Sequence, residues 1–374
     1  MRSVRDIPAL HGIPVLVRAS TNVPLVAGEV ENVFRLEHML PTIEYLAKEG
    51  ARVIIAGHIG RKDTETLAPV YNALTKMLPR IRFCPEAVGL AARAAVRELH
   101  PGEVLLLENL RRYPGEEAND PAFAAELASL ADVFVQDSFD AAHRAHASIV
   151  GVPKLLPSYA GLLFEQELKE LTKALSPAAP SLAVVSGVKF ETKAPVLKKL
   201  LATYSHVFVG GAIANDLLKA SGVSVGISVV SGADTSFLAP VLHAPSLVLP
   251  TDAVAVNKEG VKRTIDVNDI REDESIVDIG PETVAQFKEL ITSAKTILWN
   301  GPLGIFEQGY ADGTNTFARL VASSNAYSIV GGGDTVAALE ATHTMGAFSF
   351  VSTAGGAMLE FLAEGTLPGI RALS

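Results

Sequence analysis

"YSIVGGGDTVAALEA", residues 327–341, joins an apolar run to three glycines, an aspartate and a threonine, and then resumes with helix-forming residues. Each glycine costs backbone entropy and forgoes side-chain packing, so Gly331, Gly332 and Gly333 indicate that another group approaches the backbone closely. The first turn of a helix presents unpaired backbone N–H groups, which favour an anion. The stretch therefore predicts a strand, a tight turn and a helix whose N-terminus faces a ligand.

The same βα pattern recurs on both sides of this stretch. Apolar runs without polar alternation are typical of strands buried on both faces of a parallel sheet. They occupy residues 13–19, 51–58, 81–86, 103–109 and 132–138, and then 181–187, 206–211, 246–256, 275–280, 295–301, 327–333 and 348–356. Helical spacing is found between them, over 36–46 with Pro41 as a possible break and over about 282–292. We expect two doubly wound, Rossmann-like parallel-sheet α/β domains.

The chain of 374 residues exceeds the size at which one core keeps growing, which also predicts two domains. Residues 158–175 place Phe164, Leu168, Leu171 and Leu175 on one stripe before a stretch rich in Pro, Ala and Ser. We expect these residues to form an interdomain helix. It separates an N-terminal domain, residues 1–157, from a C-terminal domain, residues 176–356.

Composition narrows the classes of function. The net charge of −9 argues against a general affinity for nucleic acid or an anionic membrane. The N-terminus lacks the apolar core of a signal peptide, and no run approaches the roughly 18 apolar residues of a membrane span. Cys84 is the single cysteine, so no intrachain disulfide can form. We expect a cytoplasmic location.

Glycines cluster at the carboxyl ends of the predicted strands, in residues 57–61, 186–189, 210–214, 300–304, 331–335 and 354–357. Turns between strands and helices are often glycine-rich, so one such turn has little specificity. Ligands of open α/β sheets bind at those strand ends, and the repeated bias predicts phosphate chemistry. Neither a P-loop nor G-x-G-x-x-G occurs in a suitable context, so the common nucleotide-binding folds are not supported.

Asp334 has two interpretations. As a helix cap it would satisfy free backbone N–H groups, whereas beside a nucleotide it could help to hold Mg²⁺, which takes one or two carboxylates with phosphate oxygens and waters. Spacing alone does not decide between them, and the preceding glycines favour the metal.

Basic residues of the first half also fall at or just past predicted strand ends. These residues are Arg18, His58, Arg61, Arg111, His143, Arg144 and His146. Arginine suits bidentate recognition of carboxylate and phosphate, which predicts an anion pocket. The segment "HRAH", residues 143–146, could instead place two histidines on one helical face as zinc ligands. No HExxH or further Cys/His cluster accompanies it, so the anion pocket is preferred.

Taken together, the motifs resemble the phosphoglycerate kinase family over nearly the whole chain. The matching stretches include "VRASTNVPL", "GHIGR", "LLENLRRYPGEEANDPAFAAELASLADVFVQDSFDAAHRAHASIVG", "SGVKFETK", "VGGAIANDLLKA", "WNGPLGIFE", "GGGDT" and "STAGGAMLEFLAEGTLPG". The resemblance implies a monomeric, hinge-bending, glycolytic enzyme of two domains that transfers a phosphoryl group between 1,3-bisphosphoglycerate and ADP, with Mg²⁺. It also implies that residues 357–374 pack back on the N-terminal domain, and that the partners are small molecules.

The same resemblance implies two sets of site residues. The sugar-acid site of the N-terminal domain would comprise Ser20, Asn22, Arg35, His58, Arg61, Arg111, His143, Arg144 and His146, with Arg35 also catalytic. The nucleotide site of the C-terminal domain would comprise Gly187, Lys189, Lys193, Gly210, Gly211, Asn300, Pro302, Glu307, Gly331, Gly332, Gly333, Thr335, Gly355 and Gly356. Lys189, Gly332 and Gly333 would share in catalysis, and Asp334 would be the Mg²⁺ partner.

Several positions depart from the family pattern. Ser20 stands for an aspartate that contacts the sugar acid, and Thr21 stands for an aromatic residue. Ser186, Ala212, Ala354 and Asp140 stand for glycines. A side chain at a position that needs positive φ or close approach costs on the order of 1 kcal/mol or more. These departures leave open a kinase for a related phosphorylated acid and a non-catalytic nucleotide-binding member of the family.

Overall fold

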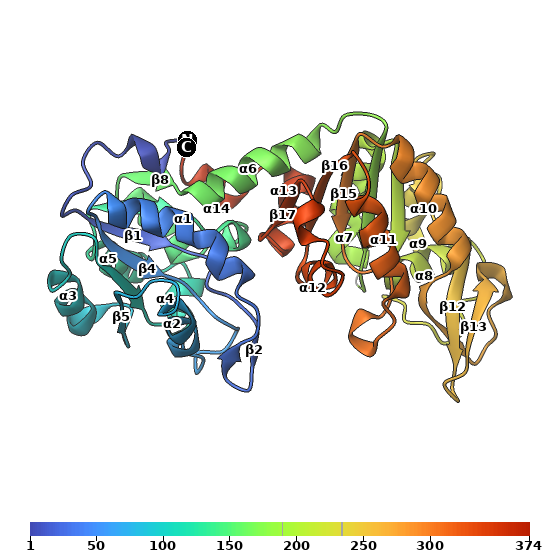
Figure 1. Ribbon diagram of the computed structural model, residues 1–374, viewed down its shortest axis with the longest axis horizontal. Helices are drawn as coiled ribbons and strands as arrows, with labels where there is room; N and C mark the ends of the chain where they lie inside the picture. Colours follow the sequence, from blue (N-terminus) through green and yellow to red (C-terminus); the bar gives the residue numbers. More distant parts are fainter. Residues whose placement is uncertain (189, 233–234) are drawn as a thin grey trace. The chain divides into compact units, whose positions relative to one another are not determined.

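The structure, a computed structural model, describes residues 1–188, 190–232 and 235–374 (Figure 1). The chain forms two compact units, one of residues 1–169 with 366–374 and the other of residues 170–365. The predicted interdomain helix 158–175 contains two elements, strand β8 (Ser158–Ala160) and helix α6 (Leu162–Leu175). The prediction of a helix from residue 158 is therefore wrong at its start, where residues 158–160 pair with β7 (Val133–Gln136). The division between the units falls inside α6.

The first unit is built on a six-stranded sheet in the order β5-β6-β4-β1-β7-β8, and its neighbouring strands pair in parallel. The strands not yet named are β1 (Pro14–Arg18), β4 (Arg52–Ala56), β5 (Ile81–Cys84) and β6 (Val104–Leu107), and a hairpin of β2 (Leu25–Val26) and β3 (Glu29–Val30) lies outside the sheet. The strand order reverses between β1 and β7. Ligands of such sheets bind at this switch point, beyond the carboxyl ends of the strands.

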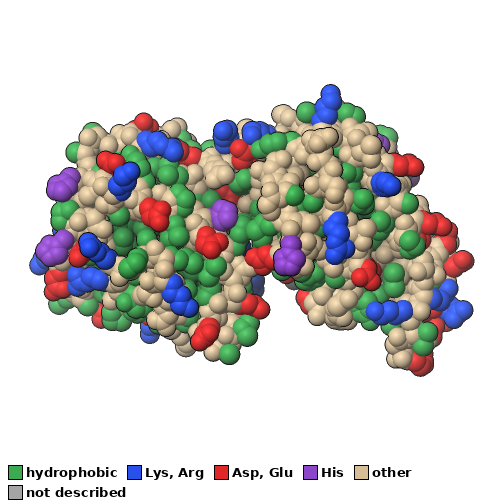
Figure 2. All heavy atoms as spheres, viewed as in Figure 1, with side chains coloured by type: hydrophobic (Ala, Val, Ile, Leu, Met, Phe, Trp, Pro, Cys, Tyr) green, Lys and Arg blue, Asp and Glu red, His purple; other side chains and the backbone are tan. Residues whose placement is uncertain are grey.

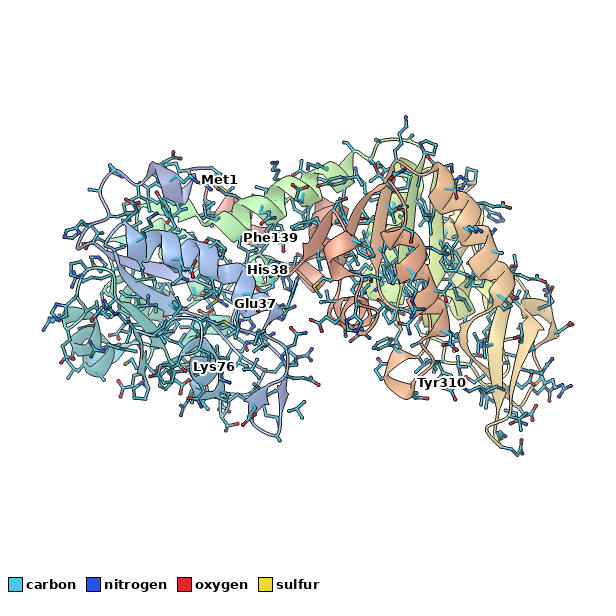
Figure 3. The ribbon with its side chains drawn as sticks, in the orientation of Figure 1. Met1, Glu37, His38, Lys76, Phe139 and Tyr310 are labelled. Atoms are coloured by element: carbon cyan, nitrogen blue, oxygen red, sulfur yellow. The ribbon has the colours of Figure 1, made fainter. Side chains whose placement is uncertain are left out.

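Side chains of these strands alternate between two cores, as the uninterrupted apolar runs predict. Val15 and Val17 of β1 face one core with α1 (Phe34–Lys48) and α2 (Ala68–Leu74), and Leu16 faces the other with α3 (Gly89–Arg97) and α5 (Pro121–Ala128). Phe139, labelled in Figure 3, packs on Phe164 of α6 with ring centroids 5.1 Å apart. Helices therefore cover both faces of the sheet.

The second unit repeats this plan. Its six-stranded sheet has the order β11-β10-β9-β15-β16-β17, again with parallel neighbours, and its strand order reverses between β9 and β15. The strands are β9 (Ser181–Ser186), β10 (His206–Gly210), β11 (Leu247–Val248), β15 (Thr296–Asn300), β16 (Tyr327–Gly331) and β17 (Phe350–Ser352). The prediction of two parallel-sheet α/β domains is confirmed.

A small antiparallel sheet in the second unit corrects the predictions for residues 246–256 and 275–280, which we expected to be strands of the parallel sheet. The run 246–256 divides into β11 and β12 (Asp252–Asn257), and β12 pairs antiparallel with β13 (Lys262–Asp266) and β14 (Glu274–Ile279). Pro250 lies where the run divides. A proline cannot donate a ladder hydrogen bond, which is one reason why a single strand does not continue through it.

The remaining elements are helical. The α-helices are α4 (Pro114–Glu117), α7 (Phe190–Thr203), α8 (Gly211–Ala220), α9 (Thr235–Leu242), α10 (Pro281–Ser293), α11 (Asp312–Ala322), α12 (Gly333–Ala341), α13 (Gly356–Glu364) and α14 (Pro368–Arg371). The shorter turns are η1 (Val4–Asp6), η2 (Leu110–Arg112), η3 (Phe139–Ala141), η4 (Ala147–Gly151), η5 (Val152–Lys154), η6 (Val267–Asp269), η7 (Phe306–Gln308) and η8 (Met345–Ala347). Pro41 does not end its helix, because α1 continues through it to Lys48.

The visible surface mixes charges of both signs. Figure 2 shows Lys and Arg side chains interspersed with Asp and Glu side chains on the face in view. Among the described residues, no helix combines the length and the apolar character that a membrane crossing requires.

Candidate active site

The first candidate site lies at the switch point between β1 and β7. The loops after these two strands carry Ser20 and Asp140, and the Ser20 hydroxyl donates to Oδ1 of Asp140 at 2.6 Å. The loop after β4 brings His58, and the Thr21 hydroxyl donates to the His58 carbonyl at 2.9 Å. The segments that carry these residues are far apart in sequence and meet because parallel strands end at one edge of the sheet.

Arg18, the last residue of β1, is the buried centre of this site, with 1% of its surface exposed. Its guanidinium donates to the Ala19 carbonyl at 2.8 Å and to the Ser148 hydroxyl at 3.0 Å, and it lies 2.9 Å from Nδ1 of His58. Ser148 in turn donates through its hydroxyl to Glu116 at 2.5 Å and through its backbone N–H at 2.9 Å. These contacts hold the guanidinium plane in one orientation.

The backbone after β4 joins two further arginines to the site. Arg35, in the first turn of α1, donates to the Asn22 carbonyl at 2.6 Å, and the Asn22 side-chain oxygen accepts the Gly60 N–H at 3.0 Å. Arg111, in η2, donates to the Gly60 carbonyl at 2.5 Å. Asn22 and Gly60 therefore connect the start of α1 to the loops after β4 and β6.

Two side chains of the pocket keep buried nitrogen atoms without hydrogen-bond partners. Nη2 of Arg111 and Nδ1 of His143 have none in the part of the chain that the structure describes. Nε of Arg111 lies 3.5 Å from the Glu117 carboxylate but makes no hydrogen bond. Buried donors without partners are costly, so these atoms indicate a ligand with acceptor oxygens.

The charges of the pocket act on one another. Burial and, after it, the positive charges of Arg144, Arg18 and Arg111 lower the pKa of His146 to about 4. Burial also lowers the pKa of Arg111, and the charge of Arg144 adds to the effect. Positive groups that depress one another's pKa gain from a bound anion, as an anion pocket requires.

The segment "HRAH" does not present its histidines on a helix. Residues 143–146 form a turn between η3 and η4, and His146 Nδ1 lies 3.9 Å from Glu116. Within residues 1–188, 190–232 and 235–374, no group of three or more His, Cys, Asp and Glu side chains could hold a metal ion. Arg61 is exposed, and its charge lowers the pKa of Arg111.

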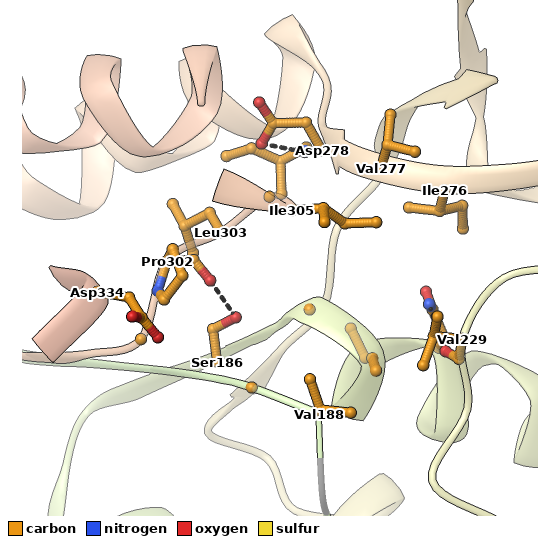
Figure 4. Close-up of a pocket in the computed structure, with 18 of the residues that line it drawn as sticks. Ser186, Val188, Val229, Ile276, Val277, Asp278, Pro302, Leu303, Ile305 and Asp334 are labelled. Atoms are coloured by element: carbon orange, nitrogen blue, oxygen red, sulfur yellow. Dashed lines mark hydrogen bonds between the residues drawn. The ribbon is translucent and has the colours of Figure 1, made fainter. Parts of the chain in front are cut away.

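The second candidate site is a cavity of about 350 Å³ in the second unit, at the switch point between β9 and β15. Figure 4 shows Asp334 beside Pro302 and Ser186, with Val229 and Ile276 at the other end of the cavity. The apolar end also includes Val277 and Ile305. A cavity with one polar, glycine-lined end and one apolar end suits a ligand that joins phosphate groups to a flat ring.

Side chains from three turns are tied together at the polar end. Lys193 of α7 donates to the Ser186 carbonyl and to the Asn300 side-chain oxygen, the latter at 3.3 Å. The Asn300 amide donates to the Gly331 carbonyl at 3.0 Å, and the Gly301 N–H donates to the Thr335 hydroxyl at 2.9 Å. The turns after β9, β15 and β16 are therefore held together by side chains.

The three glycines of residues 331–333 differ in what they permit. A Cβ on Gly331 would lie 2.4 Å from Sδ of Met358, so this glycine allows close packing. Gly332 has φ +106°, which only glycine adopts easily, and Gly333 would carry a Cβ into open space. Gly332 holds the N-cap position of α12 and Asp334 lies in its first turn, so the interpretation of Asp334 as a cap is wrong.

Most of the predicted nucleotide residues line this cavity. They are Gly187, Lys193, Gly211, Asn300, Pro302, Glu307, Gly332, Gly333, Asp334 and Thr335. Four others lie in neighbouring elements without lining it, namely Gly210, Gly331, Gly355 and Gly356. Lys189, the expected catalytic lysine, lies outside the described residues.

Four residues stand where the family pattern has glycine, and we expected a backbone cost if those positions needed positive φ. That expectation is wrong, because none of the four has positive φ. Ser186, Ala212, Ala354 and Asp140 do not have positive φ; within residues 1–188, 190–232 and 235–374, the non-glycine residues that do are Ala27, Asn119 and His343. The Ser186 hydroxyl instead makes a hydrogen bond to the Pro302 carbonyl, which joins the ends of β9 and β15.

Sequence reasoning missed the partners that orient Arg18. Ser148 is 130 residues away from Arg18 in the chain, and no local motif marks Ser148 or Glu116 as part of a basic pocket. The sequence "PGEE" predicts the start of a helix, but it does not mark Glu116 as a partner of a buried arginine, because acidic residues are common in the first turn of a helix.

Comparison with known proteins decides the family. The phosphoglycerate kinase family model matches residues 4–365. The chain belongs to the phosphoglycerate kinase family. A phosphoglycerate kinase of Rubrobacter xylanophilus is 45% identical over 385 residues, which cover 100% of this chain and 98% of the relative. A phosphoglycerate kinase of Moorella thermoacetica is 43% identical over 381 residues, which cover 98% and 97%.

Solved phosphoglycerate kinases share the fold. The structure from Pyrococcus horikoshii matches with a TM-score of 0.90 and 31% identity, and covers 100% of this chain and 98% of that one. The structure from Coxiella burnetii matches with a TM-score of 0.85 and 37% identity, and covers 99% and 98%. As a phosphoglycerate kinase family member, the protein is a phosphotransferase.

Proposed function

We propose that the protein transfers a phosphoryl group reversibly from 1,3-bisphosphoglycerate to ADP, which gives 3-phosphoglycerate and ATP. The observation that carries this proposal is the pair of sites, each at the switch point of its own parallel sheet. One is a basic pocket with unpartnered buried donors, and the other is a cavity with glycine turns at one end and an apolar lining at the other. The first suits a phosphorylated acid and the second suits a nucleotide.

On the acid side, the charged groups have separate tasks. Arg111 and His143, which keep unpartnered buried nitrogens, would receive the anionic oxygens of the acid. Arg35 is half-buried, and its bond to the Asn22 carbonyl fixes it at the start of α1. We assign Arg35 to the transferring phosphoryl group, whose charge it would stabilise. Ser20, Asn22, His58, Arg61, Arg144 and His146 would complete this site.

On the nucleotide side, Lys193 and the glycine turns would receive the phosphates. The half-buried Lys193 ammonium donates hydrogen bonds to two neutral oxygens, the Ser186 carbonyl and the Asn300 amide oxygen, and a phosphate would replace these with a full negative charge. Gly333 leaves open space over the first turn of α12. Glu307 lines the same cavity and would accept a ribose hydroxyl.

The donor set at α12 fits Mg²⁺. Asp334 is an exposed carboxylate at the polar end of the cavity, close enough to Lys193 to raise the pKa of that ammonium against the effect of burial. Mg²⁺ is commonly held by one or two carboxylates together with phosphate oxygens and waters, so a single aspartate is adequate. When bound, the ion would neutralise charge on the nucleotide phosphates.

The chemistry requires no nucleophile from the protein. A loose phosphoryl-transfer transition state needs alignment of donor and acceptor oxygens and compensation of negative charge. Arg35, Lys193, Lys189 and the backbone N–H groups of the glycine turns would supply that charge. Because each substrate binds to a different unit, transfer would require a hinge movement that brings the substrates together and excludes water.

The direct test is an assay with ATP, Mg²⁺ and 3-phosphoglycerate that follows ADP and the acyl phosphate, which hydroxylamine traps. We expect turnover by wild type and a loss of about 100-fold or more in kcat for Arg35→Ala. Arg97→Ala, which removes an exposed arginine at the end of α3, is the matched control and should keep wild-type rates. Absence of turnover by folded wild type would remove the proposal.

We also propose that the enzyme acts in the cytoplasm, because its substrates are soluble glycolytic intermediates. We propose in addition that it is a monomer. Light scattering after gel filtration would test the oligomeric state. A mass close to the 39.4 kDa of one chain is expected, and twice that mass would contradict it.

A further inference from the structure

The basic pocket contains a carboxylate that its task as an anion site does not explain. Asp140, in η3, accepts hydrogen bonds at Oδ1 from the Ser20 hydroxyl at 2.6 Å and from the Ser138 hydroxyl at 2.5 Å. Ser20 and Ser138 are fully buried, and they come from the loops after β1 and β7. The carboxylate is therefore held in place from both sides of the switch point.

Asp140 is charged in this environment. Burial raises the pKa of Asp140, but the charge of Arg35 and the hydrogen bonds from Ser138 and Ser20 oppose that effect, and the pKa lies below its usual value. A negative charge weakens a pocket for anions, because like charges repel. Its presence calls for a compensating task toward the ligand.

The acceptor capacity of Asp140 is only partly used. A carboxylate offers about four lone-pair positions on two oxygens. In the part of the chain that the structure describes, both side-chain hydrogen bonds to Asp140 end on Oδ1, which leaves Oδ2 for another donor. Asp140 is half-buried, so it keeps contact with the pocket.

The chemistry of the ligand supplies such a donor. A phosphorylated 2-hydroxy acid carries two anionic groups, which need the arginines and histidines, and one hydroxyl, which can donate a hydrogen bond. Arginine and lysine side chains have no acceptor atom. A carboxylate set among the cations is therefore well suited to recognise the hydroxyl.

We propose that Asp140 accepts the hydrogen bond of the substrate 2-hydroxyl and so selects hydroxylated acids over acids without the hydroxyl. This inference rests on the proposed function. It makes Asp140 a specificity-determining residue, and it gives Ser20 and Ser138 the task of orienting its carboxylate.

The test compares the binding of 3-phosphoglycerate with that of 3-phosphonooxypropanoate, which lacks the 2-hydroxyl, by titration calorimetry. Wild type should bind the hydroxylated acid about ten- to a hundredfold more tightly, as expected for a hydrogen bond to a charged group. In Asp140→Asn the amide oxygen can still accept from the serines, but the NH₂ group cannot accept from the ligand. The preference should then fall to about threefold or less.

A purely structural role predicts another result. If Asp140 only held Ser20 and Ser138 in place, Asp140→Asn would change the affinities for both acids by the same factor. Unchanged preference in this variant would overturn the proposal. Glu98→Gln, which alters an exposed carboxylate paired with Arg82, is the control and should keep the wild-type preference.

An exchange of the two side chains adds a gain of function. Ser20→Asp with Asp140→Ser reverses donor and acceptor across the same 2.6 Å contact and returns one carboxylate to the pocket. Asp140→Ser alone should lose the preference for the hydroxylated acid. Ser20→Asp alone should place two carboxylates in contact and weaken the binding of both acids. The double variant should recover at least part of the preference. A double variant no better than Asp140→Ser would contradict the proposal.

Binding and turnover separate the two hypotheses. Equal wild-type affinity for the two acids, with turnover of 3-phosphoglycerate, would overturn the inference and leave the proposed function intact. A wild type that binds the hydroxylated acid preferentially but does not phosphorylate it would support the inference and remove the proposed function.

Discussion

The guanidinium of Arg18 lies 2.9 Å from Nδ1 of His58, and both side chains are buried. An arginine can only donate, so Nδ1 is the acceptor and the imidazole is neutral, with its proton on Nε2. Burial, and then the charge of Arg18, lowers the pKa of His58 well below its usual value. His58 is therefore a neutral group that orients a cation.

This relationship predicts a dependence of stability on pH. In the unfolded chain His58 takes up a proton near pH 6.5, whereas the folded protein keeps it neutral to lower pH. Below pH 6.5 the unfolded state binds more protons, so the free energy of unfolding decreases as pH falls, by at most about 1.4 kcal/mol per pH unit from this group. Relative to His58→Gln, wild type should lose stability between pH 6.5 and the folded pKa.

Urea unfolding at pH 5, 6, 7 and 8 measures this difference. The exposed His100 provides the control, and His100→Gln should follow the wild-type curve. Parallel curves for wild type and His58→Gln over this range would show that the imidazole is not held neutral.

Lys193 predicts a pH dependence of nucleotide binding. Burial lowers the pKa of Lys193 to about 8, although the Asp334 carboxylate opposes the shift. Above pH 8 the ligand-free ammonium loses its proton, so affinity for ADP should fall by up to about tenfold per pH unit. Lys193→Arg stays charged and should show a weaker decline in calorimetric titrations from pH 7 to 9.5. The control is Lys198→Arg, which changes an exposed lysine on the same helix and should show the same pH dependence as wild type. An affinity of wild type for ADP that does not change with pH would refute this role of Lys193.

Two glycines with positive φ should respond differently to alanine. A Cβ on Gly301, at φ +100°, would lie 2.2 Å from the Ser186 carbonyl oxygen, whereas Gly309, at φ +82°, has no atom within 4 Å of that position. Gly309→Ala should lower the free energy of unfolding by about 1 kcal/mol. Gly301→Ala adds a backbone clash and should lose about 3 kcal/mol or more, together with ADP affinity. Equal losses in urea unfolding would contradict the predicted clash.

The variant Asp334→Asn distinguishes a role of this carboxylate in binding Mg²⁺ from a role in binding the nucleotide itself. If this carboxylate holds Mg²⁺, the variant should lose about tenfold of the extra affinity that Mg²⁺ gives to ADP, because one charged ligand is removed. Binding of ADP in EDTA should not weaken, since a negative charge near the phosphates is also lost. Asp312→Asn, likewise exposed in the first turn of a helix, is the control. Equal weakening with and without Mg²⁺ would show that Asp334 does not act through the metal.

The parallel sheets could be predicted because their strands are buried on both faces, and Pro14–Arg18 and Thr296–Asn300 are buried at every position. Strand Lys262–Asp266 escaped prediction because its residues are largely exposed and charged, without a period that marks a strand. Pro41 gave a false signal, since packing of Leu36, Met39 and Ile43 in the core stabilises α1 through it.

The candidate site, like the fold, could be predicted from the sequence only in part. Strand ends predict where Arg18 and His58 lie, because parallel topology places carboxyl ends together. Their orientation depends on Ser148 and Glu116, which tertiary packing brings in. Likewise the triple glycine predicts close approach, but only the structure separates Gly331, which packs on Met358, from Gly333, which faces open space.

On the proposed function, the protein moves the terminal phosphoryl group of ATP directly to a phosphorylated acid. Incubation with Mg²⁺, 3-phosphoglycerate and ATP labelled in the γ-phosphate with ³²P tests it most directly. We predict label in an acyl phosphate that hydroxylamine cleaves, at a rate that Arg35→Ala and Lys193→Ala both reduce by about 100-fold or more. Label found only in inorganic phosphate, from wild-type protein shown to be folded, would contradict the account.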